Sequence, residues 1–302
     1  MNKSVRCGYV AILGRPNVGK STLLNRLLGQ KISITSRRPQ TTRHRILGIK
    51  SSPEHQLIFV DTPGIHLDNK HALNRRLNKT AASVIHDVDI LVFVVSALYW
   101  QKEDELVLSL IKKSESPVIV VVNKVDKIAD KSRLLPFLTF IQETINPVQI
   151  IPLSAKTGSN TDLLENHLIE LLPTTDFFFF PNEQLTDKPD QFMMSEMIRE
   201  KLMRALGQEL PYATTVQIQS LTKREDGLIS ISAIILVERD SQKGIVVGEG
   251  GLRLREIGRQ ARMDMEKWLN AKVFLRLWVK VKSGWSDDEK ALKLLGYDDD
   301  NG

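Results

Sequence analysis

Short apolar runs alternate with amphipathic segments through the first 172 residues. The runs at 8–13, 56–60, 90–95, 117–122 and 148–153 are rich in Val, Ile and Leu, which is typical of parallel strands buried on both faces. Between them, apolar residues recur at helical spacing over about 19–28, 70–86, 102–113, 131–144 and 160–171. This alternation of strand and helix predicts a doubly wound α/β sheet.

The pattern changes after residue 172. Prolines, turn-forming residues and acids fill 173–190 and predict a connector. We expect its four phenylalanines, Phe177–Phe180, to pack where two domains meet. The element order that follows is helix, strand, strand, short helix, glycine turn, helix, strand, and it predicts a separate α+β domain.

The predicted elements of this second half are a helix over 192–207, strands over 213–223 and 228–239, a helix to about 269 and a strand over 272–282. We therefore divide the chain into a nucleotide-binding domain (1–172), a linker (173–190), a second domain (191–283), and a C-terminal helix with an acidic tail (284–302).

Composition changes the picture in three ways. The single cysteine, Cys7, excludes an intrachain disulfide and fits a reducing cytoplasm. The longest apolar runs are too short to span a bilayer, and the chain enters its first strand at once, so we expect no signal peptide. Net charge is +6, concentrated in two basic blocks (1–172 and 193–282) that flank an acidic connector. Basic blocks favour a polyanionic partner.

The sequence "GRPNVGKS" at 14–21 follows a predicted strand and opens a predicted helix. In that context it indicates a phosphate-binding loop, whose glycines allow the backbone N–H groups to wrap a phosphate. We expect Lys20 to reach the β- and γ-phosphates and Ser21 to ligate Mg²⁺.

Three further motifs follow predicted strands. "DTPG" at 61–64 places Asp61 where it can hold Mg²⁺ through water and Gly64 where its N–H can meet the γ-phosphate.

"NKVD" at 123–126 indicates guanine, because the Asp126 carboxylate can accept from the two adjacent donors that adenine lacks. Asn123 could bond the O6/N7 edge of the base, and Ala155 of "SAK" at 154–156 could donate its N–H to O6. An ATPase is the weaker alternative.

The loop over 36–45 must supply a threonine that senses the γ-phosphate through Mg²⁺. Thr41 and Thr42 are both candidates, and we favour Thr42. The residue after "DTPG" is Ile65, which cannot orient water, so we expect slow intrinsic turnover. Asn17 could help to hold a monovalent cation such as K⁺.

These motifs give a set of expected nucleotide contacts. The expected catalytic residues are Lys20, Thr42, Asp61 and Gly64, and the expected Mg²⁺ ligands are Ser21, Thr42 and Asp61. The expected GTP contacts are Gly14, Arg15, Pro16, Asn17, Val18, Gly19, Lys20, Ser21, Asp61, Thr62, Pro63, Gly64, Ile65, Asn123, Lys124, Val125, Asp126, Ser154, Ala155 and Lys156.

A second glycine turn, "GEGG" at 248–251, lies between a short apolar segment and an arginine-rich helix. It lacks the Lys-Ser/Thr of a triphosphate site, and its element order is that of a type II KH domain, whose G-x-x-G turn grips about four nucleotides of single-stranded nucleic acid. Glu249 is unusual there, since it adds negative charge beside the expected phosphates. We expect an apolar groove floor that includes Val246 and Ile257. The expected RNA contacts are Lys243, Val247, Gly248, Glu249, Gly250, Gly251, Arg253, Arg255 and Arg259.

With "QTTRHR", "DTPGI", "EMIREKLMR", "ELPY" and the closing "LWVKVKSGWSDDEKALKLLGY", the whole chain resembles the bacterial Era GTPases. The resemblance implies a GTPase domain followed by a KH domain, binding near the 3′ end of 16S ribosomal RNA, and assembly of the 30S subunit. It also implies a cytoplasmic, monomeric protein that binds no DNA, with some peripheral association with the inner membrane.

Two alternatives remain open. One is a GTPase of the membrane or tRNA-modification type, which would carry a partner domain with a folate or cysteine site. The other is an RNA-binding scaffold whose nucleotide site is structural only and which does not hydrolyse GTP. We also expect the acidic tail at 297–302 to cover the RNA groove in the GDP state.

Overall fold

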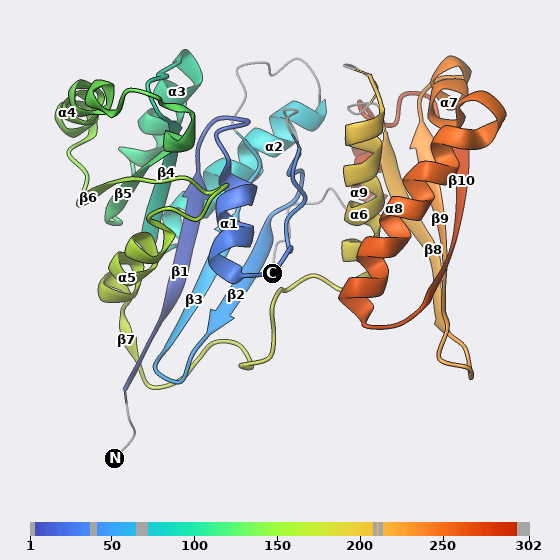
Figure 1. The fold of residues 1–302 in the computed structure, drawn as a ribbon, viewed down its shortest axis with the longest axis horizontal. Coiled ribbons are helices and arrows are strands. Elements are labelled where there is room, and N and C mark those ends of the chain that lie inside the picture. The colour runs from blue at the N-terminus through green and yellow to red at the C-terminus, as the bar shows by residue number, and fades with distance from the viewer. Residues whose placement is uncertain (1–3, 37–40, 65–71, 208–209, 211–213, 295–302) are drawn as a thin grey trace. The chain divides into compact units, whose positions relative to one another are not determined.

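The computed structural model describes residues 4–36, 41–64, 72–207, 210 and 214–294. The chain divides into two compact units, and the boundary along the connector lies between Asp187 and Lys188. Each unit has its own sheet with helices packed on it (Figure 1). No helix of the described residues is long and apolar enough to cross a membrane.

The first unit is built on one mixed sheet with the strand order β2-β3-β1-β4-β5-β6. The pairs β3–β1, β1–β4, β4–β5 and β5–β6 are parallel, as expected for a doubly wound sheet. Its main strands are β1 (Val5–Leu13), β2 (Ile46–Ser51), β3 (His55–Asp61), β4 (Ile90–Ser96), β5 (Val118–Asn123) and β6 (Gln149–Pro152).

Helices cover both faces of this sheet because successive strand residues point to opposite sides. Val10 and Ile12 of β1 pack with α1 (Lys20–Leu28) and α5 (Thr161–Leu171). Ala11 and Leu13 pack on the other side with residues from α2 (Ala72–Ser83), α3 (Lys102–Ile111) and α4 (Leu134–Ile145). Three short 3₁₀ turns, Val84–His86, Val125–Lys127 and Lys131–Arg133, complete the unit.

The hydrophobic pattern did not predict β2, and no element was assigned to this stretch. It is an antiparallel strand joined to β3 by a tight turn at Ser52–His55. Gly48 at its centre lies against α1, and an added Cβ would sit 2.5 Å from Leu28 Cδ1. A glycine in the middle of a short apolar run weakens the strand signal, whereas here it permits close packing.

The connector lies on the first unit, and the expectation that Phe177–Phe180 pack at a domain junction is wrong in that respect. Phe178 and Phe180 pack against the core of the α2–α4 side, and Phe179 stacks on Tyr9. The strand β7 (Thr174–Thr175) pairs with β1. Hydrogen bonds also hold the connector on the first unit. Buried Gln56 accepts from the N–H groups of Phe179 and Phe180 and donates to the Phe180 carbonyl.

The end of the connector closes the free edge of β2. The N–H of Ile49 donates to the Leu185 carbonyl at 2.9 Å, and the N–H of Leu47 donates to Asp187 Oδ1 at 2.9 Å. These bonds satisfy an edge that would otherwise be open to pairing with another chain. The strand that follows Thr42 is therefore bonded to residues that lead directly into the second unit.

The second unit has a three-stranded sheet of order β10-β9-β8 with helices α6 and α8 packed on it. β8 and β9 are antiparallel, and β9 and β10 are parallel. Its elements are α6 (Asp190–Ala205), β8 (Thr215–Lys223), β9 (Ile229–Val237), α7 (Asp240–Val247), α8 (Leu252–Leu269), β10 (Val273–Val281) and α9 (Glu289–Leu294). Their order confirms the one expected from the sequence.

The buried Gln56 generates a stability prediction. Gln56→Leu keeps the side-chain volume but leaves the Phe179 and Phe180 N–H groups without their acceptor. We expect a loss of about 2–4 kcal/mol in the free energy of unfolding, measured by urea denaturation. Gln219→Leu, at an exposed position of β8, is the matched control and should change stability by about 0.5 kcal/mol or less. Equal stabilities of the two variants would contradict this role of Gln56.

Candidate functional site

The phosphate loop lies between the end of β1 and the start of α1, as the motif predicts. Gly14, Asn17 and Gly19 have φ angles of 151°, 63° and 107°, and positive φ angles are typical of loops whose backbone N–H groups bind anions. A Cβ on Gly19 would sit 2.3 Å from Asn123 Nδ2. Glycine is therefore required there both by the turn and by the close approach of the base-binding segment.

Lys20 is held inside the loop. Its Nζ donates to the carbonyls of Gly14 at 2.8 Å and Arg15 at 3.1 Å, and the residue is 6% exposed. Burial lowers the pKa of Lys20 to about 8, although nearby Asp61 acts in the opposite direction. The ammonium is positioned for an anion that enters the loop.

Hydroxyl and carboxylate oxygens converge beside Lys20. Ser21 Oγ lies 2.9 Å from Thr42 Oγ1, and both hydroxyls donate to Asp61 Oδ2, at 3.1 and 3.2 Å. Asp61 is fully buried, and its Oδ1 has no hydrogen-bond partner among the described residues. Burial raises the pKa of Asp61, while the hydroxyl bonds lower it.

This arrangement fits a magnesium ion. Hydroxyl and carboxylate oxygens are the ligands that Mg²⁺ prefers, and it usually takes only one or two carboxylates together with phosphate oxygens. The described residues hold no cluster of three or more His, Cys, Asp or Glu that could bind a metal by itself. Of the two candidate threonines, Thr42 is the one whose hydroxyl joins Ser21 and Asp61.

One member of this cluster was missed by the sequence analysis. Ser33 is fully buried, and its Oγ donates to Asp61 Oδ2 at 2.7 Å, the shortest bond to that carboxylate. Asn25 of α1 fixes the segment, since its Oδ1 accepts from the N–H groups of Ile32 and Ser33 and its Nδ2 donates to the Ser33 carbonyl. No motif marks a serine in a loop, so only the fold could identify it.

The base-recognition motifs meet at the carboxyl ends of β5 and β6. Asn123 Nδ2 donates to the Val18 carbonyl at 2.8 Å, and its Oδ1 accepts from the N–H of Ala155 at 3.0 Å. Asn123 therefore joins the phosphate loop to the segment at 154–156. Lys124 donates to the Asn17 carbonyl.

Asp126 is the exposed carboxylate at this end of the site. Ser154 Oγ donates to its Oδ1 at 2.6 Å and so fixes the orientation of the carboxylate. Hydrogen bonds also hold the segments around it: the N–H of Val125 donates to the Leu153 carbonyl, and the guanidinium of Arg26 donates to the Lys156 carbonyl. An oriented carboxylate can accept from two adjacent donors, as guanine requires.

The remaining residues of the motifs support the loop. Arg15 Nε donates to buried Asp104 at 2.9 Å, which ties the phosphate loop to the start of α3. Thr62 donates to the Ile12 carbonyl, and Gly64 approaches Pro16 so closely that an added Cβ would lie 3.0 Å from it. Pro63 lies between Thr62 and Gly64 in the sequence, and Ile65 falls outside the described residues.

The second glycine turn joins α7 to α8. Gly248, Gly250 and Gly251 have φ angles of 73°, 54° and 76°, and an added Cβ on Gly248 would lie 2.7 Å from that of Arg253. Gly250 and Gly251 face open space, and Glu249 is exposed. This leaves the turn backbone accessible to a phosphodiester.

The cations around the turn are exposed but differ in their contacts. Arg253 donates to the Ile245 carbonyl across the turn. Arg259 forms a two-bond ion pair with Glu256 on the same helix, at 2.8 and 2.7 Å. Lys243 and Arg255 are exposed, and Val247 is half-buried.

The expected apolar floor of the groove is wrong in part. Val246 is fully buried and Ile257 is 2% exposed, so both belong to the core. They occupy the faces of α7 and α8 that point inward, as helical spacing dictates. Ile245 and Leu252, at 43% and 62% exposed, remain accessible beside the turn.

Comparison with known proteins matches both halves of the chain. A family model described as 50S ribosome-binding GTPase matches residues 9–124, and a KH domain model matches residues 209–286. GTPase Era of Coxiella burnetii is 54% identical over 297 residues, which cover 98% of this chain and 100% of the relative. GTPase Era of Pseudomonas fluorescens is 53% identical over 296 residues, 98% of each chain. The chain belongs to the Era GTPase family.

Membership of the Era family confirms the expected fold class and the GTPase activity. Two solved Era structures superpose with TM-scores of 0.93 at 38% identity, each over 97% of this chain and 99% of its own. One is an Aquifex aeolicus Era variant bound to GDP·AlF₄⁻. The other is Era in complex with MgGDPNP and nucleotides 1506–1542 of 16S ribosomal RNA.

The contact of Ser33 with Asp61 predicts a defect in metal use. Ser33→Ala should raise the Mg²⁺ concentration required for half-maximal GTPase activity by about tenfold, because outer hydrogen bonds orient metal ligands. A Mg²⁺ titration of initial rates tests this. The control is Ser109→Ala, which removes an exposed hydroxyl of α3. Overlapping titration curves for the two variants would refute the role of Ser33.

The lowered pKa of Lys20 predicts proton uptake on nucleotide binding. Above pH 8 the free protein loses the Lys20 proton, whereas bound phosphates favour the charged form, so affinity for GTP should decline as pH rises through that value. Titration calorimetry at about pH 8.5 in buffers of different ionisation enthalpy measures the uptake. Lys20→Arg should take up no proton. Wild-type protein that also takes up none would count against a lowered pKa.

Proposed function

We propose that the chain is a GTP-driven switch that binds the 3′ region of 16S ribosomal RNA through its KH turn and promotes assembly of the 30S subunit. One observation carries the proposal: the solved Era that holds MgGDPNP and nucleotides 1506–1542 of 16S RNA matches this chain over almost its full length. The phosphate loop and the open turn at 248–251 supply the two sites that such a complex needs.

In the GTP site we assign four roles. Lys20 neutralises charge on the β- and γ-phosphates, and the Gly64 N–H meets the γ-phosphate. Ser21, Thr42 and Asp61 would hold Mg²⁺. The bound ion would neutralise the charge that develops on the phosphates. The convergence of these oxygens supports that assignment, as does Asp61 Oδ1, which has no hydrogen-bond partner within the part of the chain that the structure describes.

Coupling to RNA uses the connector. Thr42 responds to the γ-phosphate and lies four residues before β2, and Leu47 of β2 bonds Asp187, which lies three residues before α6. A change of order in the Thr42 loop would therefore alter the segment that enters the KH unit. This chain of bonds supports a switch.

The two alternatives are less well supported. A structural nucleotide site conflicts with membership of a GTPase family. The curated relatives that align over 98–100% of their own length are named GTPase Era, which favours the proposed switch over a GTPase of the membrane or tRNA-modification type. We also propose a cytoplasmic monomer with some peripheral attachment to the inner membrane and no DNA binding, which rests on the family resemblance. Coverage of the groove by the tail at 297–302 lies outside the described residues.

The RNA-binding assignment can be tested at Gly250. Gly250→Asp fits the open space and the left-handed backbone, which Asp tolerates, but adds a negative charge where a phosphodiester would lie. We expect affinity for a 16S 3′-end RNA to fall by about tenfold or more, with a shallower salt dependence. Gly284→Asp, also at positive φ with open space around it, should bind as the wild type does. If both bind equally, the turn is not the RNA site.

We further propose that Asn17 helps to hold K⁺ beside the phosphates, which compensates for the apolar Ile65 after "DTPG". The left-handed, exposed position of Asn17 in the phosphate loop supports this. GTP hydrolysis should be at least several-fold faster in K⁺ than in Na⁺ buffer, and Asn17→Ala should remove the difference. Equal rates of the wild-type protein in both salts would end the K⁺ hypothesis.

A further inference from the structure

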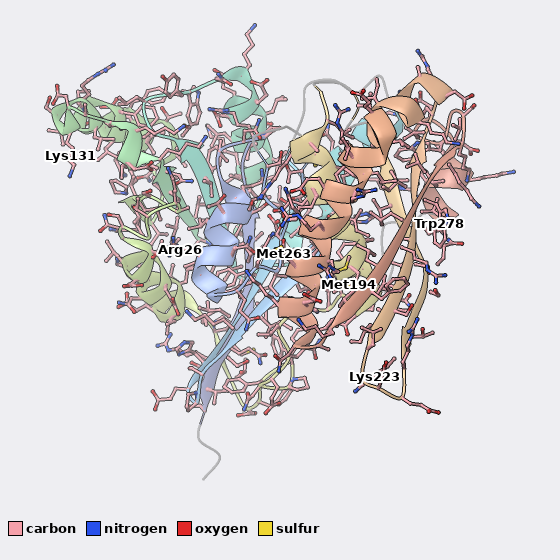
Figure 2. All side chains as sticks on the ribbon, turned by 45° about the vertical axis from the view of Figure 1, so that its right-hand side comes forward. Arg26, Lys131, Met194, Lys223, Met263 and Trp278 are labelled. Atoms are coloured by element: carbon pink, nitrogen blue, oxygen red, sulfur yellow. The ribbon has the colours of Figure 1, made fainter. Side chains whose placement is uncertain are left out.

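The last strand of the KH unit alternates two kinds of residue. Val273 and Val279 are buried on its inner side, while Phe274, Arg276 and Trp278 are exposed between them. Successive strand residues point to opposite faces, so Phe274, Arg276, Trp278 and Lys280 lie together on the face of the sheet away from α6 and α8. Figure 2 shows Trp278 on this side of β10. We call these four residues, with Ser230 and Ser232 of β9, the outer face.

The two rings have different neighbours on β9. Phe274 pairs with Ser230 and Arg276 pairs with Ser232 in the register of β9, and the hydroxyl residues Thr222 and Ser220 follow on β8. Phe274 is 40% exposed and Trp278 is 46% exposed. Phe274 therefore lies beside hydroxyl residues, whereas Trp278 pairs with Ile234, and both rings keep exposed surface.

Cations already gather over one of these rings. The guanidinium carbons of Arg276 and Arg224 lie 5.0 and 5.8 Å from the centroid of the Phe274 ring. No strand position on the outer face is Asp or Glu; Glu225 and Asp226 lie in the turn between β8 and β9, and Glu238 follows the end of β9. The combination of aromatic rings and positive charge is the one that binds single-stranded nucleic acid by stacking and phosphate contact.

We propose that the outer face is a second RNA-binding surface, which takes single-stranded RNA beyond the few nucleotides held at the glycine turn. Bases stack on Phe274 and Trp278, which are roughly 13 Å apart along the strand, and Arg276 between them contacts the phosphate backbone. The positive charge disfavours a second copy of this chain as the occupant. The inference rests on RNA binding by the KH unit and extends it.

Two RNA probes separate this surface from the turn. One is a strand of about five nucleotides, enough to fill the turn, and the other is a strand of about twenty nucleotides that contains it. Trp278→Leu and Phe274→Leu keep apolar bulk over the sheet but remove the stacking ring, and Trp278→Phe keeps a ring. Phe177→Leu, at an exposed ring of the first unit, is the matched control.

We expect each leucine variant to weaken binding of the long strand by about tenfold and to leave the short strand within twofold. Trp278→Phe and Phe177→Leu should bind both as the wild type does, and ultraviolet cross-links should map to residues 273–281. Unchanged affinity of the leucine variants for the long strand would overturn the proposal. Leucine variants that lose binding to the small subunit but keep their affinity for both RNA strands would also overturn it, because they would indicate a protein partner for the outer face. If the wild-type protein bound neither strand, the result would contradict the proposed function as well as the second surface.

Discussion

Asp61 is a carboxylate without exposed surface, and three hydroxyl donors from three separate segments satisfy one of its oxygens. A buried carboxylate is costly unless cations or donors surround it. Ser21 comes from the helix after the phosphate loop, Ser33 from the segment that Asn25 fixes, and Thr42 from the loop before β2. The fold of the first unit brings these segments together, and a divalent ion with a triphosphate would supply the charge that the site lacks.

The same requirement connects the Mg²⁺ site to the strand that follows. Thr42 Oγ1 donates to Asp61, and β2 begins shortly after Thr42. The connector then satisfies the free edge of β2 through Leu185 and Asp187. In the switch that we propose, a change in these hydrogen bonds would alter the segment that continues into α6.

The sequence predicts those features that local chemistry determines. The apolar runs identify the five strands buried on both faces, and the glycines at 14, 19 and 248 mark turns where φ is positive. Thr42 could be favoured over Thr41 but not settled, because both hydroxyls fit the motif. Contacts between distant segments could not be predicted: Ser33 meets Asp61 only through α1, and Asp104 meets Arg15 only through the packing of α3.

Two errors have the same origin. Gly48 weakens the apolar run of β2, and only the neighbouring Leu28 reveals that a glycine is needed there. The run of phenylalanines indicates burial but not the surface that buries it, and the partner proved to be Gln56 and the core of the first unit. Periodicity shows which side of an element is buried, whereas the identity of its neighbour depends on the whole fold.

We infer that the nucleotide in the GTP site determines the affinity of the protein for RNA. The most direct measurement is the affinity for a 16S 3′-end RNA of wild-type protein and of Asp187→Ala, each with GDP and with a nonhydrolysable GTP analogue. We predict that the wild type binds RNA more tightly with the analogue than with GDP. This difference in RNA affinity should be smaller for Asp187→Ala, which loses the bond to Leu47. Equal RNA affinity of the wild type with the two nucleotides would contradict it.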